Sequence, residues 1–165
     1  MRRNQRLPDY MPILNDRMAR GDYLPHYEER EITEPVDLCD AHGYLNPATD
    51  RYAGEIADAV TDLSFWTTEQ TQGFYGSPLA TFEEYMNWGL VGLRYVDEAP
   101  GEDHEKLLNR LDKFMGVDGR GFLQFSEFSA FLVETYTNRG EGETIADLYP
   151  LIVQWFAAHE AQEKR

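Results

Sequence analysis

The spacing of apolar residues beyond residue 50 is the feature that most restricts the fold of this chain. Ile56, Ala59, Val60 and Leu63 recur at i, i+3, i+4 and i+7, the spacing of one face of an amphipathic helix. This pattern and similar ones after it predict helices at residues 51–66, 81–95, 104–115, 126–136 and 144–162. We therefore predict a mainly α fold of about five helices without a long strand.

The segments between these helices contain the residues that commonly end them. Residues 67–80 are predicted to be a loop, residues 97–103 a linker and residues 138–143 a glycine-containing break. Pro150 lies inside the last predicted helix, and proline removes a backbone donor and clashes with the preceding turn. We therefore expect that helix to kink or to start again at Pro150.

Residues 1–50 differ from the helical domain predicted for residues 51–165. Prolines recur through the first segment and push the residues before them away from helix, which predicts an extended arm. The arm is nevertheless rich in large apolar and aromatic residues, which include Tyr10, Tyr23 and Tyr27. We expect it to lie on a surface, either that of its own domain or that of a partner, and these tyrosines are its candidate partner contacts.

The segment from Gly116 to Phe128 has the residue order of a calcium-binding loop. With Gly116 at position 1, position 3 is Asp118, position 6 is Gly121, position 8 is Leu123 and position 12 is Glu127. With its flanking helices, the unit at residues 102–136 resembles an EF-hand helix–loop–helix. The resemblance implies a sharp turn at the glycine and pairing of position 8 with a neighbouring loop. It implies a calcium site formed by Asp118, the Phe122 carbonyl, Gln124 and Glu127.

Two residues depart from the calcium-binding pattern. Gly116 has no side-chain oxygen at position 1, and Arg120 places a cation at position 5. The remaining oxygens are fewer than the six to eight that calcium takes, so we expect calcium binding to be weak or absent and no other cofactor. Arg120 is free to pair with Glu127 or Asp118 and to close this degenerate loop without a metal ion.

A plain β-hairpin is the alternative for this loop, because Asp118-Gly119 between apolar flanks is a common type I′ turn sequence. EF-hands usually occur in pairs, and residues 51–95 are the candidate for a second helix–loop–helix. Its sequence Phe82-Glu83-Glu84-Tyr85 resembles the end of such a loop, although the loop before it has no Asp. Within that loop, Phe74 and Tyr75 are candidate anchors for a partner, since exposed loop aromatics often dominate binding.

The charge balance excludes some classes of partner. The chain has 30 acidic and 15 basic residues and a net charge of -15. A high-salt host and a bias in the coding sequence are two alternative origins of this composition. Nucleic acids and anionic membrane surfaces require a basic footprint, so both are disfavoured. The single cysteine rules out an intrachain disulfide, and no apolar run is long enough to cross a membrane. We expect a cytoplasmic protein.

Cys39 and His42 form the only other candidate chemical site. Their spacing is that of half a zinc site, but no second Cys/His pair exists to complete four ligands. A small metal- or thiol-dependent enzyme that uses these two residues therefore remains one alternative. A calcium-responsive binding module is another. The leading prediction is a non-catalytic protein–protein interaction module or accessory subunit, because no catalytic motif is present and the arm and loops carry aromatic residues.

Overall fold

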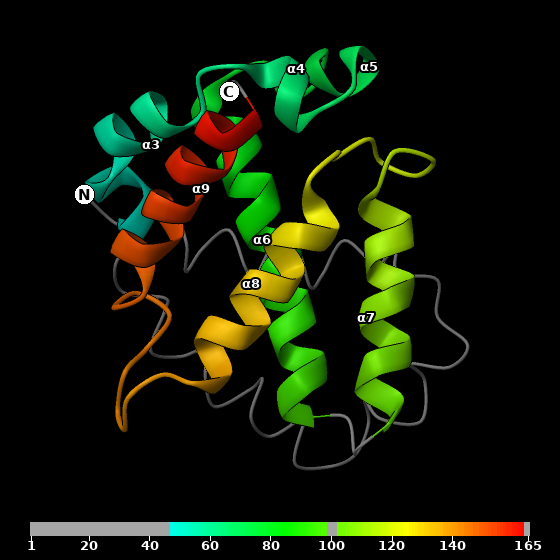
Figure 1. Ribbon diagram of the computed structural model, residues 1–165, viewed down its shortest axis with the longest axis vertical. Helices are drawn as coiled ribbons and strands as arrows, with labels where there is room; N and C mark the ends of the chain where they lie inside the picture. Colours follow the sequence, from blue (N-terminus) through cyan, green and yellow to red (C-terminus); the bar gives the residue numbers. More distant parts are fainter. Residues whose placement is uncertain (1–46, 99–101, 164–165) are drawn as a thin grey trace, which may run out of the picture. The chain divides into compact units, whose positions relative to one another are not determined.

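The computed structural model describes residues 47–98 and 102–163, which belong to one compact unit (Figure 1). The arm tyrosines Tyr10, Tyr23 and Tyr27 and the pair Cys39 and His42 lie outside the described residues. The described part is mainly helical and contains no strand, as predicted. Residues 47–51 are already helical, so the helical part includes the last residues that the sequence assigns to the arm.

The described residues form more helices than the predicted five. They are α3 (Ala53–Ala59), α4 (Leu63–Trp66), α5 (Glu69–Gln72), α6 (Pro78–Glu98), α7 (Glu102–Met115), α8 (Phe125–Thr137) and α9 (Tyr149–Glu163). The prediction of one helix over residues 51–66 was wrong, because the chain leaves the helical conformation between α3 and α4. The prediction of a continuous loop over residues 67–80 was also wrong, since α5 and the first turn of α6 lie within it.

Short polar contacts set these helix ends. The Asp62 carboxylate accepts a hydrogen bond from the Ser64 N–H at 3.0 Å and caps the start of α4, which satisfies a donor that a helix start leaves free. Helix α6 begins at Pro78, where a proline needs no N–H partner, and the Ser77 hydroxyl accepts from the Ala80 N–H. Helix α9 begins at Tyr149, so Pro150 lies in its first turn, as expected for a helix that starts at this proline. The prediction of helix over residues 144–148 was wrong, because no helix precedes Tyr149 there.

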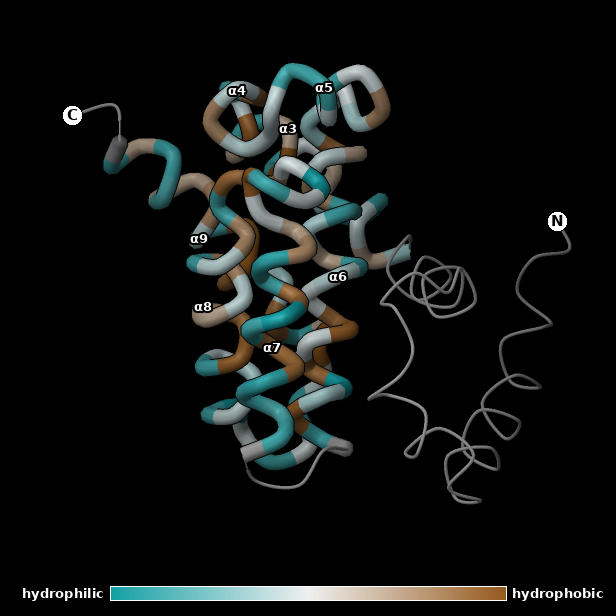
Figure 2. Tube along the Cα trace, turned by 90° about the vertical axis from the view of Figure 1, so that its right-hand side faces the viewer, coloured by the Kyte–Doolittle hydropathy of each residue, from teal (hydrophilic) through white to brown (hydrophobic). Residues whose placement is uncertain are grey.

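Helix α6 is the central element of the described part, and α3, α7 and α8 all pack against it (Figure 1). Gly89 permits the close approach of α6 and α8, because a Cβ there would lie 2.6 Å from Leu132 Cδ2 and 2.9 Å from Phe128 Cε1. Helix α9 packs on α3. Hydrophilic and apolar residues alternate along α7 in Figure 2, as expected of an amphipathic helix with one solvated face.

The core is unusually aromatic. Its largest fully buried side chains include Trp66, Tyr85, Phe122, Phe128 and Phe156, which come from α4, α6, the loop before α8, α8 and α9. Their rings meet mainly edge-to-face or tilted, with Tyr85 and Phe156 at 5.6 Å and Tyr85 and Phe128 at 5.5 Å. None of the described helices combines the length and the apolarity that a membrane crossing needs.

Candidate functional site

The loop after α4 and the loop after α7 pair with each other near the start of α6. Thr67, after α4, and Phe122, before α8, form an antiparallel β-bridge. The Thr68 N–H donates to the Gly121 carbonyl at 2.9 Å, and the Leu123 N–H donates to the Trp66 carbonyl at 2.8 Å. We call residues 66–75 and 116–124 the paired loops. They connect α4 to α6 and α7 to α8, respectively.

The second of the paired loops closes on its own backbone. The Gly116 carbonyl accepts hydrogen bonds from the N–H groups of Gly119 at 3.0 Å and Gly121 at 2.9 Å. Gly121 has a φ of 79°, a backbone conformation that glycine adopts without the steric cost that a Cβ brings. The hairpin alternative was wrong, because Phe122 pairs with Thr67 and the Asp118-Gly119 turn joins no two strands among the described residues.

Replacing Gly121 with alanine is expected to lower the free energy of unfolding by about 2 to 3 kcal/mol, from positive φ and from overpacking. The new Cβ would collide with the hydroxyl oxygens of Thr68 and Thr71 in the facing loop. Gly142→Ala is the matched control, since Gly142 has a φ of 81° but open space around a Cβ. It should cost only about 1 kcal/mol. Equal losses in urea unfolding of both variants would contradict the close packing of the paired loops.

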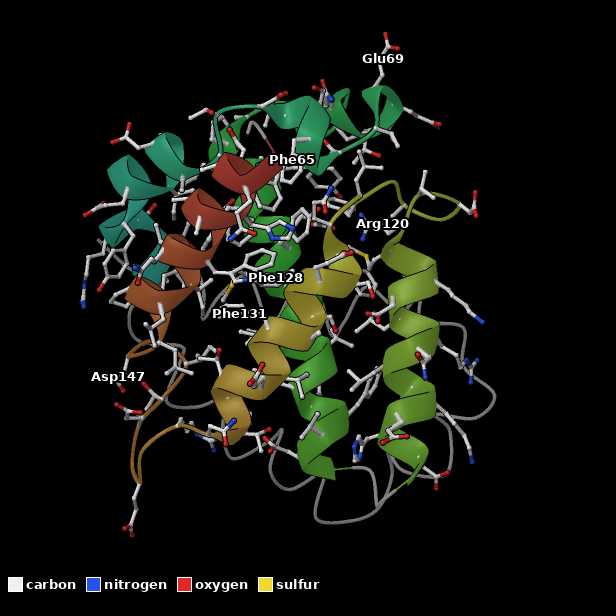
Figure 3. The ribbon with its side chains drawn as sticks, viewed as in Figure 1. Phe65, Glu69, Arg120, Phe128, Phe131 and Asp147 are labelled. Atoms are coloured by element: carbon white, nitrogen blue, oxygen red, sulfur yellow. The ribbon has the colours of Figure 1, made fainter. Side chains whose placement is uncertain are left out.

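Arg120 lies on the second loop (Figure 3), and its side chain reaches α6. One guanidinium nitrogen, Nη2, lies 2.7 Å from Glu84 Oε1 in α6, and it donates to the Tyr75 hydroxyl at 2.6 Å. The same Glu84 oxygen accepts from Trp88 Nε1 at 3.0 Å and from the Tyr75 hydroxyl at 3.1 Å. We call these four residues the Arg120 lock. The expected pairing of Arg120 with Glu127 or Asp118 was wrong, because its ion-pair partner is Glu84 of α6.

The Arg120 lock is shielded from solvent, unlike a surface ion pair. The Glu84 side chain is only 5% exposed and that of Arg120 is 24% exposed. The guanidinium also lies over the rings of Trp88, Tyr75 and Phe122, at 5.1, 5.7 and 5.8 Å from their centroids. Burial raises the pKa of the Tyr75 hydroxyl and the Glu84 carboxylate raises it further, so Tyr75 stays protonated and donates to Glu84.

A second buried carboxylate, Glu160 of α9, holds the turn between α3 and α4. Its Oε2 accepts from Trp66 Nε1 at 2.7 Å and from the Thr61 N–H at 2.9 Å, and the Asp62 N–H lies at 3.3 Å. The Thr61 hydroxyl donates to the other oxygen, Oε1. These four residues are the Glu160 lock. Glu160 is 4% exposed, and these donors supply hydrogen bonds to both of its buried oxygens.

The residues predicted as calcium ligands are used in different ways. Asp118 and Glu127 are exposed, and Phe122 is fully buried. The Gln124 amide donates to the Phe65 carbonyl at 3.2 Å, and its oxygen lies 3.3 Å from His159 Nε2. Within residues 47–98 and 102–163, no group of three or more His, Cys, Asp or Glu side chains is arranged to hold a metal ion.

The two predicted loop anchors have different environments. Phe74 is 79% exposed. Tyr75, next to it, is half-buried in the Arg120 lock and its ring lies 5.6 Å from that of Phe122. Only Phe74 therefore presents a free aromatic ring at the paired loops.

Sequence reasoning missed the role of both buried carboxylates. For Glu84, the resemblance of Phe82-Glu83-Glu84-Tyr85 to the end of a calcium-binding loop was the one available signal. Glu160 carries no local signal, because its partners lie 94 to 99 residues away.

A third acid, Asp112 of α7, lies at the base of the second loop, where the Ser126 hydroxyl donates to its Oδ2 at 3.3 Å. Burial raises the pKa of this carboxyl against the lowering effect of the hydroxyls of Ser129 and Ser126.

No protein family model, curated protein or solved structure matches this chain. Its function therefore has to be argued from the residues themselves.

Proposed function

We propose that this chain is a non-catalytic accessory subunit that binds another protein, built on a degenerate EF-hand-like scaffold that is closed without an ion. The observation that carries the proposal is the Arg120 lock, in which a guanidinium holds the buried Glu84 carboxylate. In this proposal, Arg120 supplies the positive charge that a calcium-dependent scaffold takes from a bound metal ion.

Three features of the paired loops support the EF-hand-like part of the proposal. The loops are joined by one short antiparallel bridge, and Leu123, at position 8, donates its N–H to the neighbouring loop. Gly121, at position 6, has positive φ. Glu84 of α6 and Glu127 of α8 are each followed by a buried aromatic residue, Tyr85 and Phe128.

Closure without a metal ion would make partner binding independent of calcium. A calcium sensor changes conformation when the ion arrives, and its binding surface depends on the ion. A scaffold closed by Arg120 presents the same surface at all calcium concentrations. Phe74 on the first loop and the arm aromatics Tyr10, Tyr23 and Tyr27 are the residues that we propose contact the partner.

The test compares the full chain, purified with its native partner, in millimolar calcium and in a chelator. We expect the same partner in equal amounts under both conditions and no heat of calcium binding by calorimetry, because the carboxylate of Glu84 is already occupied. Replacing Tyr10, Tyr23 and Tyr27 with serine should release the partner, whereas Tyr52→Ser should not.

A measurable heat of calcium binding, with partner recovery only in calcium, would instead make this chain a calcium-responsive module. Retention of the partner by the triple tyrosine variant would remove the arm from the proposal.

A further inference from the structure

Helices α8 and α9 share a half-exposed surface, which reaches the paired loops at His159, where Nε2 lies 3.3 Å from Gln124 Oε1. Its centre is a stack of three rings, in which Phe131 lies on Trp155 with centroids 5.2 Å apart and planes at 16°. Trp155 lies in turn on His159, with centroids 4.4 Å apart and planes at 15°. All three rings are half-buried, so their edges remain in contact with solvent.

The neighbours of this stack follow the helical period. On α9, Leu151 and Ala158 lie four residues before and three residues after Trp155, on the same face, and both are exposed. Leu151 is one of the few large apolar side chains with more than half of its surface exposed. We call Phe131, Leu151, Trp155, Ala158 and His159 the α8–α9 strip; Figure 3 shows Phe131 on the side of α8 toward α9.

The rim of the strip is acidic. On α8, Glu127 and Glu134 lie four residues before and three residues after Phe131, and both are exposed. Neither α8 nor α9 contains a Lys or Arg along its length. The cations that follow these helices in sequence are Arg139, two residues beyond the end of α8, and Lys164, the residue after α9. The Arg139 guanidinium is 3.6 Å from the centroid of the Tyr136 ring.

We infer that the α8–α9 strip binds a basic amphipathic helix of a partner protein. The apolar strip fits the apolar face of such a helix, and the small side chain of Ala158 leaves room for close approach. Lys or Arg residues flanking that face would meet Glu127 and Glu134, and the net charge of -15 would steer a basic partner to the surface. A second copy of this chain fits poorly, because pairing two strips would bring the two acidic rims together.

This inference rests on the proposed function, since both treat the chain as an interaction module, but it uses neither the arm nor the Arg120 lock. Its test is therefore independent of calcium and of the arm tyrosines. Trp155 is a built-in probe, because the other two of the chain's three tryptophans, Trp66 and Trp88, are buried. A change in emission on binding would report mainly on the strip.

The experiment titrates the full chain with a synthetic amphipathic helix of leucine and lysine. We expect a shift in Trp155 emission and protection from acrylamide quenching, and no such change with a matched peptide that has glutamate in place of lysine. Ala158→Arg should weaken binding roughly tenfold, because it places a cation and a long side chain at the strip. Ala57→Arg, at an exposed alanine of α3, makes the same charge change elsewhere and should alter affinity by less than about threefold.

A second variant tests the rim without adding bulk. Replacing Glu127 and Glu134 with glutamine should weaken binding of the lysine peptide severalfold. The urea unfolding curve of this variant should match that of the natural protein. Equal losses in Ala158→Arg and Ala57→Arg would overturn the inference, since binding would then follow net charge alone. Binding of the glutamate peptide, absence of binding, or a dimer that Ala158→Arg dissociates would also overturn it.

Discussion

Arg120→Met is expected to lower the free energy of unfolding by about 3 kcal/mol, the lower end of the cost of leaving a buried charge unpaired. The variant leaves the Glu84 carboxylate, which is 5% exposed, with only the Tyr75 and Trp88 donors. It also removes the cation from above the Trp88 ring. Urea unfolding followed by far-UV circular dichroism measures the change.

Two comparisons separate this loss from a general effect of removing a cation. Lys106→Met breaks an exposed pair with Asp103, with side chains 72% and 59% exposed, and should cost less than about 0.5 kcal/mol. The double variant Arg120→Met, Glu84→Gln should be less destabilised than the sum of the single variants, by about 1 to 3 kcal/mol, because the stranded charge is gone. Additive effects would show that Arg120 and Glu84 do not interact in solution.

Glu160→Ala is expected to have an effect of similar size, about 3 kcal/mol or more, because buried donors then lose their acceptor. The carboxylate accepts from the Trp66 indole N–H, the Thr61 N–H and the Thr61 hydroxyl, so its removal affects α4 and α9 together. Trp66 is fully buried, and we expect its emission to shift to longer wavelength as α4 loosens. Urea unfolding and fluorescence of the same samples test both effects.

The control for Glu160 is a carboxylate without buried partners. Glu134→Ala removes an exposed acid from the middle of α8 and should change stability by less than about 0.5 kcal/mol. Glu160→Gln keeps one acceptor oxygen and should fall between the alanine variant and the natural protein. A glutamine variant as stable as the natural protein would show that the charge of Glu160 contributes nothing beyond hydrogen bonding.

The sequence predicted those parts of the fold that depend on neighbouring residues. The apolar period identified α7 and α8 to within about two residues at each end, since each buries a single face against α6. Pro150 marked the start of α9 because its effect on the backbone is local. The interruption between α3 and α4 was missed, because the apolar period continues through Val60 and Leu63 while the N–H groups of Thr61 and Asp62 turn to a distant carboxylate.

The candidate site was predicted less well, because its contacts join residues that lie far apart in the sequence. The sequence identified Arg120 as one of two residues, with Gly116, that depart from a calcium-binding pattern. It could not identify Glu84 as the partner, because that pairing depends on how α6 packs against the loop between α7 and α8 rather than on spacing within one loop. The ring stack of Phe131, Trp155 and His159 was equally hidden, since its members come from two helices joined by a long connection.

The Glu160 lock also bears on how the described helices unfold. It connects α9 to a turn 99 residues earlier in the chain, and the Arg120 lock connects two loops across the bridge between Thr67 and Phe122. Contacts of such long sequence separation form only when most of the chain is already ordered, because closing a long loop costs entropy before the contact stabilises it. Helices as short as α3, α4 and α5 have little stability alone, so they depend on α9 and on the second loop and should unfold with them in a single transition.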